Sequence, residues 1–221
     1  MLVTMRLTIC FLLLLTIAAS CNKKKLKGEG DDVTDTVEMA AFSHIKLLSN
    51  SPLTIEKSNN YDVIITGHPD LVGAYRPQIK DDTLTLEYDP YYTSVKDDNI
   101  RLVIRVPYLY GLYNNGKATV TVLPGFNGDN LRTGIDGPGN IHFSSGSYTR
   151  LDAVLNGPGE LFADQLACDS VYAHVSSGGT MSVRSLYYLY ARVNGAGTIN
   201  YYGQPDTADL GTTGGGVINQ K

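Results

Sequence analysis

Apolar and polar residues alternate with a period of two along most of the chain. From Phe42 onward, no stretch of adequate length places apolar residues at helical spacing. The alternating stretches are "HIKLLS" (44–49), "LTIEKS" (53–58), "DVIITG" (62–67), "TLTLEY" (83–88) and "IRLVIRV" (100–106). We therefore predict an all-β protein, with a hairpin at Asp81-Asp82 whose register the sequence does not fix.

The second half of the chain repeats a glycine-containing segment at intervals of 18 to 21 residues. The copies are "IDGPGNIHF" (135–143), "LNGPGELFA" (155–163), "VSSGGTMSV" (175–183), "VNGAGTINY" (193–201) and "TTGGGVINQ" (212–220), after a weaker copy, "NNGKATV" (114–120). In the third copy Ser177 takes the first corner position, beside Gly178. The predicted corner glycines are Gly116, Gly137, Gly157, Gly178, Gly195 and Gly214. A period near twenty indicates one structural unit per repeat.

Each unit carries an alternating strand on either side of its glycines, and only the remaining segment varies in length. The strand after the glycines presents one column of apolar residues: Ile141, Leu161, Met181, Ile199 and Ile218. We predict a β-helix-like solenoid with turns of about 18–21 residues over residues 111–221, preceded by an N-terminal β-strand region of the same domain. Glycine suits the corners because neighbouring corners stack closely and because a sharp turn favours positive φ. In this register Leu131 is equivalent to Leu151.

Two motifs resemble one known family. The string "GAGTINYYGQP" (195–205), followed by a glycine-rich repeat, and the upstream "RVPYLYGL" (105–112) are similar to the head GIN domain family, often labelled auto-transporter adhesins. The resemblance covers about residues 40–221, and we assign residues 39–221 to this domain. It implies an exported envelope protein or lipoprotein with a repetitive β-fold, and it offers no catalytic residues to transfer.

The N-terminus indicates export. Arg6 precedes the apolar run "LTICFLLLLTIAAS", which suits a signal peptide over residues 1–20 and is short for a bilayer span. Ala18, Ala19 and Ser20 before Cys21 resemble the bacterial lipobox, so we predict lipidation at Cys21; an ordinary secretory signal is the alternative. Residues 22–38 are rich in Lys, Gly and Asp, and we predict that residues 21–38 form a lipidated cysteine and a flexible tether.

Composition excludes several function classes. The chain has 18 basic and 22 acidic residues, a net charge of -4, which does not favour nucleic acid. Cys168 is the one cysteine of the predicted folded domain, and we interpret it as a buried small hydrophobe. The histidines fall at unrelated repeat positions without metal-ligand spacing: His44, His68, His142 and His174. No outward row of the repeats gathers two or three carboxylates, so we predict no catalysis, no cofactor and no metal.

Two features suggest binding. Tyr172 and Tyr190 occupy one outward row, and tyrosine gives a large contact area with a polar tip, although it is also a strong strand former. A polar column precedes the corners, and we interpret it as a structural ladder: Asp136, Asn156, Ser176, Asn194 and Thr213. The favoured hypothesis is a non-catalytic envelope lipoprotein that displays a repeat domain for adhesion, scaffolding or assembly. The alternative is a carbohydrate-binding or degenerate polysaccharide-lyase-like protein, which a groove of exposed tyrosines with paired Asp or Arg would favour.

The predicted partners are the membrane, through the lipid anchor, a glycan or envelope protein, and a second copy of the chain. The final unit stops three residues after Ile218 without an evident cap, so either self-association or a segment of the N-terminal half would cover it. Lipoproteins destined for the surface in some lineages carry acidic residues after the cysteine, whereas "NKKK" follows Cys21. We therefore expect the outer membrane, with the periplasmic face favoured over the surface.

Overall fold

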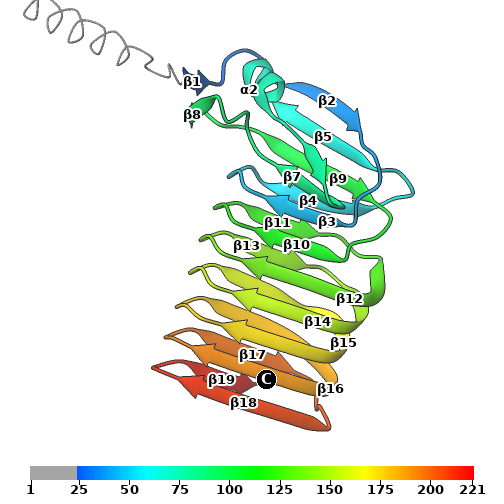
Figure 1. The fold of residues 1–221 in the computed structure, drawn as a ribbon, viewed down its shortest axis with the longest axis vertical. Helices are drawn as coiled ribbons and strands as arrows, with labels where there is room; N and C mark the ends of the chain where they lie inside the picture. The colour runs from blue at the N-terminus through cyan, green and yellow to red at the C-terminus, as the bar shows by residue number, and fades with distance from the viewer. Residues whose placement is uncertain (1–23) are drawn as a thin grey trace, which may run out of the picture.

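The computed structural model describes residues 24–221, and the predicted signal peptide and Cys21 lie outside this range. Strands dominate the described residues (Figure 1). The N-terminal elements are β1 (Lys24–Lys27), β2 (Val33–Glu38), β3 (His44–Leu47), β4 (Leu53–Lys57), β5 (Asp62–Gly67), α2 (Pro69–Ala74), β6 (Gln78–Lys80), β7 (Thr83–Leu86), β8 (Tyr92–Lys96) and β9 (Arg101–Val106). The later strands are β10 (Gly111–Asn114), β11 (Thr119–Val122), β12 (Phe126–Ile135), β13 (Asn140–Phe143), β14 (Gly146–Leu155), β15 (Glu160–Val175), β16 (Thr180–Asn194), β17 (Thr198–Tyr202), β18 (Thr207–Thr213) and β19 (Val217–Gln220).

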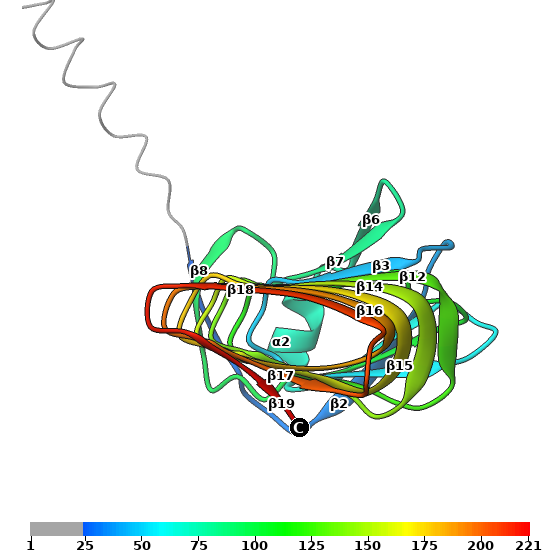
Figure 2. The same cartoon turned by 90° about the horizontal axis from the view of Figure 1, so that it is seen from below.

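The predicted β-solenoid is confirmed, with about six turns of about 20 residues. Successive turns pair in parallel. On one side β10 pairs with β12 and β12 with β14, and on the other β11 pairs with β13 and β13 with β15. Seen along its axis, the coil has a flattened outline in which equivalent strands lie over one another (Figure 2). β15 and β16 run continuously from one flat side to the other, so a single long strand forms parts of two sides.

The predicted register is also confirmed. Leu131 pairs with Leu151 and Arg132 with Asp152, as the glycine alignment requires. Two further outward pairs follow in the same register, Tyr172 with Tyr190 and His174 with Arg192. The inward column is buried as predicted at Ile141, Leu161, Met181 and Ile199, each 0% exposed. Apolar alternation and corner position therefore define which face of each strand points to the core.

The parallel stack begins before the predicted range of residues 111–221. β3 pairs in parallel with both β10 and β7, and β4 pairs in parallel with both β11 and β9. The β3–β4 turn therefore lies between two turns that come later in the sequence. Antiparallel strands β2, β5 and β9, together with α2, close this end of the coil (Figure 1). The six-residue α2 begins at Pro69 and buries Leu71, Val72 and Ala74, and no helical spacing in the sequence announces so short an element.

The hairpin predicted at Asp81-Asp82 is confirmed as β6–β7, with Lys80 opposite Thr83. Both aspartates have positive φ, +49° and +61°, as a two-residue hairpin turn of this kind requires. Aspartate tolerates this conformation better than most residues, which explains its use at both positions.

The flexible tether predicted for residues 22–38 is wrong over its described part. β1 pairs in parallel with β8, and β2 pairs with β5 over its whole length. Leu26 is buried, and Gly28 donates its backbone N–H to the carbonyl of Lys96. The domain therefore includes residues 24–38 and does not begin at residue 39. The composition predicted a flexible tether because β2 is held by backbone hydrogen bonds and buries little apolar surface.

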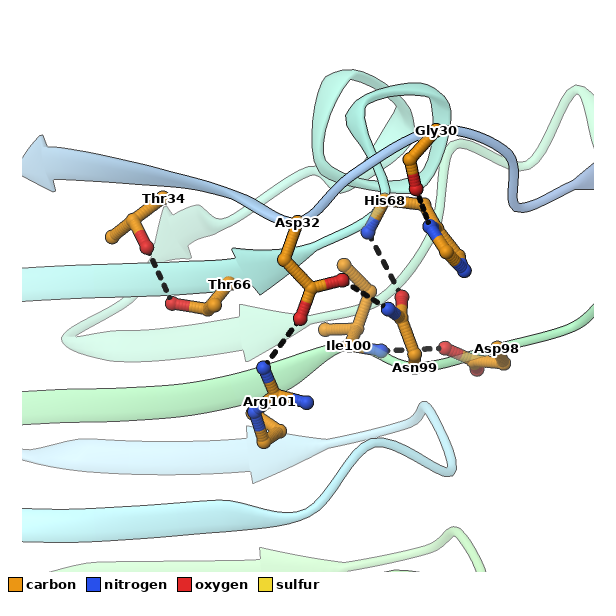
Figure 3. A network of polar contacts seen from close by, with 9 residues as sticks. All are labelled: Gly30, Asp32, Thr34, Thr66, His68, Asp98, Asn99, Ile100 and Arg101. Carbon is orange, nitrogen blue, oxygen red and sulfur yellow. Dashed lines mark hydrogen bonds and ion pairs between the residues drawn. The ribbon is translucent and has the colours of Figure 1, made fainter.

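A polar network fixes this N-terminal segment to the domain (Figure 3). The Asp32 carboxylate accepts hydrogen bonds from Asn99 Nδ2 at 2.6 Å and from Arg101 at 2.7 Å. The Arg101 contact holds the pKa of Asp32 below its ordinary value. Asn99 Oδ1 accepts the backbone N–H of His68, and the His68 ring contacts the carbonyl of Gly30 at 2.6 Å. Residues 24–38, which we call the strap, thus lie across the N-terminal end.

Candidate functional site

The glycine corners stack on the corners of the preceding turn. A Cβ atom on Gly137 would collide with the carbonyl of Gly116, and one on Gly157 would collide with the carbonyl of Gly137. Gly195 is less crowded, and of the predicted corner glycines only Gly214 has positive φ, +85°. Close approach, rather than backbone conformation, thus accounts for glycine at most corners.

The third corner differs locally from its neighbours. Gly178 has open space where a Cβ would lie, whereas Ser177 occupies the stacked position and its Oγ donates to the carbonyl of Gly157. The crowded glycine of this turn is Gly179, above Gly159. The predicted corner residue Gly178 therefore faces away from the stack, and a serine hydroxyl replaces the first corner glycine.

The polar column before the corners forms hydrogen bonds between turns. Asp136 accepts from Asn115 Nδ2 and from Asn156 Nδ2, both at 2.9 Å. Ser176 donates to Asn156 Oδ1, and Thr213 donates to Asn194 Oδ1. The amides and hydroxyls satisfy one another, so this edge is a structural ladder and offers few free groups to a ligand.

The predicted binding residues Tyr172 and Tyr190 lie together on one flat side of the solenoid. Their ring centroids are 6.0 Å apart. The Arg150 guanidinium lies 3.8 Å from the centroid of Tyr172, and the Arg192 guanidinium lies 4.0 Å from the centroid of Tyr190. Such stacked cations and rings attract each other, and each guanidinium keeps the neighbouring ring in place.

The same side continues toward the N-terminal end. We call this surface the Tyr–Arg face and define it by Tyr110, Arg132, Arg150, Tyr172, Tyr190 and Arg192. A groove of about 680 Å³ opens on it. The groove is lined by His44, Tyr110, Asp129, Asn130, Arg132, Arg150 and Asp152.

Ion pairs hold the groove in shape. Arg150 donates to both oxygens of Asp152, with its closest contact at 2.7 Å, and these bonds raise the pKa of its guanidinium. Arg132 lies 3.9 Å from the same carboxylate, and 68% of its side chain is exposed. Asp152 therefore anchors Arg150, while Arg132 keeps most of its donors free for a partner.

Sequence reasoning missed Arg150, which stands over Tyr172. The predicted register rests on the equivalence of Leu131 and Leu151, whereas β14 starts upstream of Leu151, at Gly146. Extending the alternation upstream would have placed Arg150 on the outward side, two residues before Asp152. The signal is concealed because two residues in succession, Thr149 and Arg150, separate the buried Tyr148 and Leu151 and interrupt the alternation.

The remaining candidate residues lie apart from one another. His44 contacts Asp82, His142 stacks on Phe162 at 4.4 Å, and His68 belongs to the strap network. Cys168 is buried and free, and burial raises its pKa to about 12. Within residues 24–221, no group of three or more His, Cys, Asp or Glu residues could hold a metal ion.

No helix among the described residues is long and apolar enough to cross a membrane.

Comparisons with known proteins give one family and several solved structures of similar fold. A family model described as "Putative auto-transporter adhesin, head GIN domain" matches residues 41–145 and 126–205. No curated protein matches the chain significantly. A crystal structure of a "putative adhesin" from Bacteroides fragilis NCTC 9343 is similar, with a TM-score of 0.72 and 21% identity over 89% of this chain and 100% of that one.

Two structures from Parabacteroides distasonis ATCC 8503 are also similar. A "putative adhesin" has a TM-score of 0.59 and 19% identity, and a "putative lipid binding protein" has a TM-score of 0.56 and 16% identity. Each comparison covers 90% of this chain and 100% of the other. At these identities the likeness shows the fold alone.

Proposed function

Because the chain belongs to the head GIN domain family, we propose that it is a non-catalytic cell-envelope lipoprotein that displays its β-solenoid for adhesion, scaffolding or assembly. The family description as an adhesin supports a role in the envelope. The Tyr–Arg face is the proposed contact surface. Its stacked arginines and tyrosines are the single observation that carries this proposal.

The chemistry of the Tyr–Arg face suits binding. Tyrosine and arginine are enriched where protein surfaces bind partners, because both bury large areas and still form hydrogen bonds. Tyr172 and Tyr190 are held by their neighbours on adjacent turns, so little side-chain entropy remains to be lost on binding. The regular spacing of about 4.8 Å between turns favours an extended, repetitive partner.

The same contacts argue against catalysis at this groove. A general base needs a carboxylate or imidazole that is free to accept a proton. Asp152 is occupied by Arg150 through three hydrogen bonds, and Arg132 approaches it as well. The groove therefore offers donors and rings for recognition, and its best-placed carboxylate is already paired.

A carbohydrate-binding role is the second candidate, and the groove favours it. Exposed tyrosine beside paired Arg and Asp is the combination expected of a glycan surface, and Tyr110, Arg150 and Asp152 provide it. The free donors of Arg132 would suit a sugar carboxylate. This candidate differs from general adhesion in requiring a defined acidic glycan.

An oligosaccharide array tests both candidates. The full-length protein in mild detergent is compared with the triple variant Arg150→Ala, Tyr172→Ala, Tyr190→Ala, with Val33→Ala as the control because Val33 is 42% exposed on β2, at the other end of the fold. We expect binding to uronic-acid oligosaccharides that the triple variant loses and the control retains, with no shortened products by mass spectrometry. Binding equal in all three proteins would contradict the role of the face.

Lipidation at Cys21 completes the proposal. Only three peptide bonds separate Cys21 from Lys24, so an acylated Cys21 would hold the strap within about 11 Å of the bilayer. We propose the outer membrane, with the periplasmic face favoured because lysines follow the cysteine. Cys21→Ala should abolish fatty-acid labelling and release the protein from membranes. Labelling that persists in this variant would exclude the anchor.

A further inference from the structure

A second cleft lies away from the Tyr–Arg face, at the N-terminal end of the glycine corners. It has a volume of about 610 Å³, within the range of small-molecule sites. The turn between β3 and β4 forms one wall, and the segment from β7 through β8 to the start of β9 forms the other. The lining residues that carry the argument are Asn50, Ser51, Glu87, Tyr88, Tyr92 and Asp98.

The lining combines aromatic rings with neutral and acidic polar groups. Two tyrosines, two carboxylates, an amide and several hydroxyls face the space, and no Lys, Arg or His is among the lining residues. Glu87 and Asp98 would repel an anion, so a phosphate or a uronic acid does not suit this cleft. The absence of a metal-holding group among residues 24–221 leaves the carboxylates available as hydrogen-bond acceptors.

The cleft is organised before any ligand arrives. Tyr88 donates its hydroxyl to Asp98 Oδ1 at 2.6 Å, and the backbone N–H of Ile100 donates to the same oxygen at 3.1 Å. Burial and the Asp98 contact raise the pKa of Tyr88, so it remains a donor. Tyr75 packs edge-on against Tyr88, with centroids 5.0 Å apart, and Ser49 anchors the Tyr75 hydroxyl at 2.6 Å. Asp98 Oδ2 is left to accept a further hydrogen bond.

Ser51 belongs to the wall behind the cleft and not to its open surface. It is 1% exposed, so a ligand could not reach its hydroxyl, which lies beside the hydroxyls of Tyr75 and Tyr88. The side chains that a ligand could reach are the exposed Asn50 and Asp98 and the half-buried Tyr92.

We infer that this cleft binds a neutral sugar ring of a glycan chain. A pyranose has an apolar face of C–H groups that packs on a tyrosine ring, and hydroxyls around its edge that bond to carboxylates and amides. Tyr92 supplies the ring at the rim, and Asn50 and Asp98 supply acceptors and donors beside it. The site is independent of the Tyr–Arg face, whose exposed Arg132 suits acidic glycans instead.

The test measures binding of full-length protein in mild detergent to an array of neutral gluco-, galacto-, manno- and xylo-oligosaccharides. We expect at least one of these to bind, with affinity reduced about tenfold or more by Tyr92→Ala and by Asp98→Asn, and retained in Tyr92→Phe, which keeps the ring. Tyr187→Ala is the control, because Tyr187 is 58% exposed on the distant β16. Thermal unfolding confirms that each variant is folded.

The outcomes separate this site from the Tyr–Arg face. Neutral binding that falls in the Tyr92 and Asp98 variants, and persists in the triple variant of the Tyr–Arg face, supports the cleft. Neutral binding that only the triple variant loses assigns the sugar to the Tyr–Arg face and overturns this inference. No neutral binding at millimolar oligosaccharide also overturns it, whatever the acidic glycans do.

Discussion

Gly157 sits beneath the carbonyls of Asp136 and Gly137, and it donates its own N–H to Ile135 at 3.1 Å. Its φ is not positive, so the space, not the backbone conformation, requires glycine there. The repeat of glycine could be predicted from the sequence, because every turn meets the same crowding. The reason for glycine could not be predicted, because close approach of a neighbouring turn and a positive φ both require the same residue.

Replacing a corner glycine by alanine should destabilise the protein at crowded positions and have little effect at open ones. Gly157→Ala would push a methyl group into backbone atoms, and we expect a loss of about 2–4 kcal/mol in the free energy of unfolding. Gly178→Ala is the matched control, with nothing within 4 Å of its Cβ and an expected change within about 0.5 kcal/mol. Denaturant unfolding measures both. Equal losses would mean that the corners do not stack as described.

The burial of Cys168 can be tested through the pH dependence of the free energy of unfolding. Burial raises its pKa to about 12, above that of an unfolded cysteine near 8.5, so the folded state holds the proton that the unfolded state releases. Stability should therefore be fully present below about pH 8.5 and fall by up to about 1.4 kcal/mol per pH unit between the two values. In Cys168→Ala the measured slope should be shallower. Rapid alkylation of native Cys168 at pH 8 would contradict its burial.

At the scale of elements, alternation predicted the strands of the solenoid well because one face of each is fully buried. It failed for the strap, where β2 is mostly exposed and its partner β5 supplies backbone hydrogen bonds. It also predicted too short a strand at β14, and overlooked Arg150, because Thr149 and Arg150 interrupt the alternation between the buried Tyr148 and Leu151. Elements held by backbone pairing leave little trace in hydrophobic pattern.

The strap should resist proteolysis. Trypsin could cut a flexible tether readily after Lys24, Lys25 and Lys27, whereas pairing of β1 with β8 protects these bonds. We expect slow cleavage after Lys27, accelerated several-fold by Asp32→Ala, which removes the acceptor shared by Asn99 and Arg101. Mass spectrometry of the digest follows the rate. Immediate cleavage of the unmodified protein would contradict the strap and support the flexible tether predicted from the sequence.

The far end of the coil carries an open edge in residues 24–221. Within this range β18 pairs only with β16 and β19 only with β17, while Leu210 and Val217 are 42% and 48% exposed. Because this edge would template another strand, we expect a protein of residues 24–221 to self-associate. Gln220→Pro should weaken the association, since the Val217 and Lys221 N–H groups point to β17 and that of Gln220 points outward. A monomer by light scattering at about 100 μM would reject it.

At the scale of the whole molecule, the solenoid is closed at one end by α2 and the strap, and it presents two distinct long sides (Figures 1 and 2). The corner edge is occupied by its own ladder of amides and hydroxyls, whereas the Tyr–Arg face presents half-buried rings and guanidiniums and the exposed Arg132 to solvent. The sequence predicted that Tyr172 and Tyr190 share a row. It did not predict the stacking of Arg150 and Arg192 on these rings, which depends on the conformations of the two arginine side chains.

Hydroxyl-radical footprinting of the full-length protein tests the contact surface most directly. The protein is oxidised alone and with the uronic-acid oligosaccharide that binds it most tightly, and each tyrosine is quantified by mass spectrometry. If the Tyr–Arg face makes the contact, oxidation of Tyr172 and Tyr190 should fall several-fold on binding, while that of the exposed Tyr187 stays constant. Unchanged oxidation of Tyr172 and Tyr190 in the saturated complex would contradict the account.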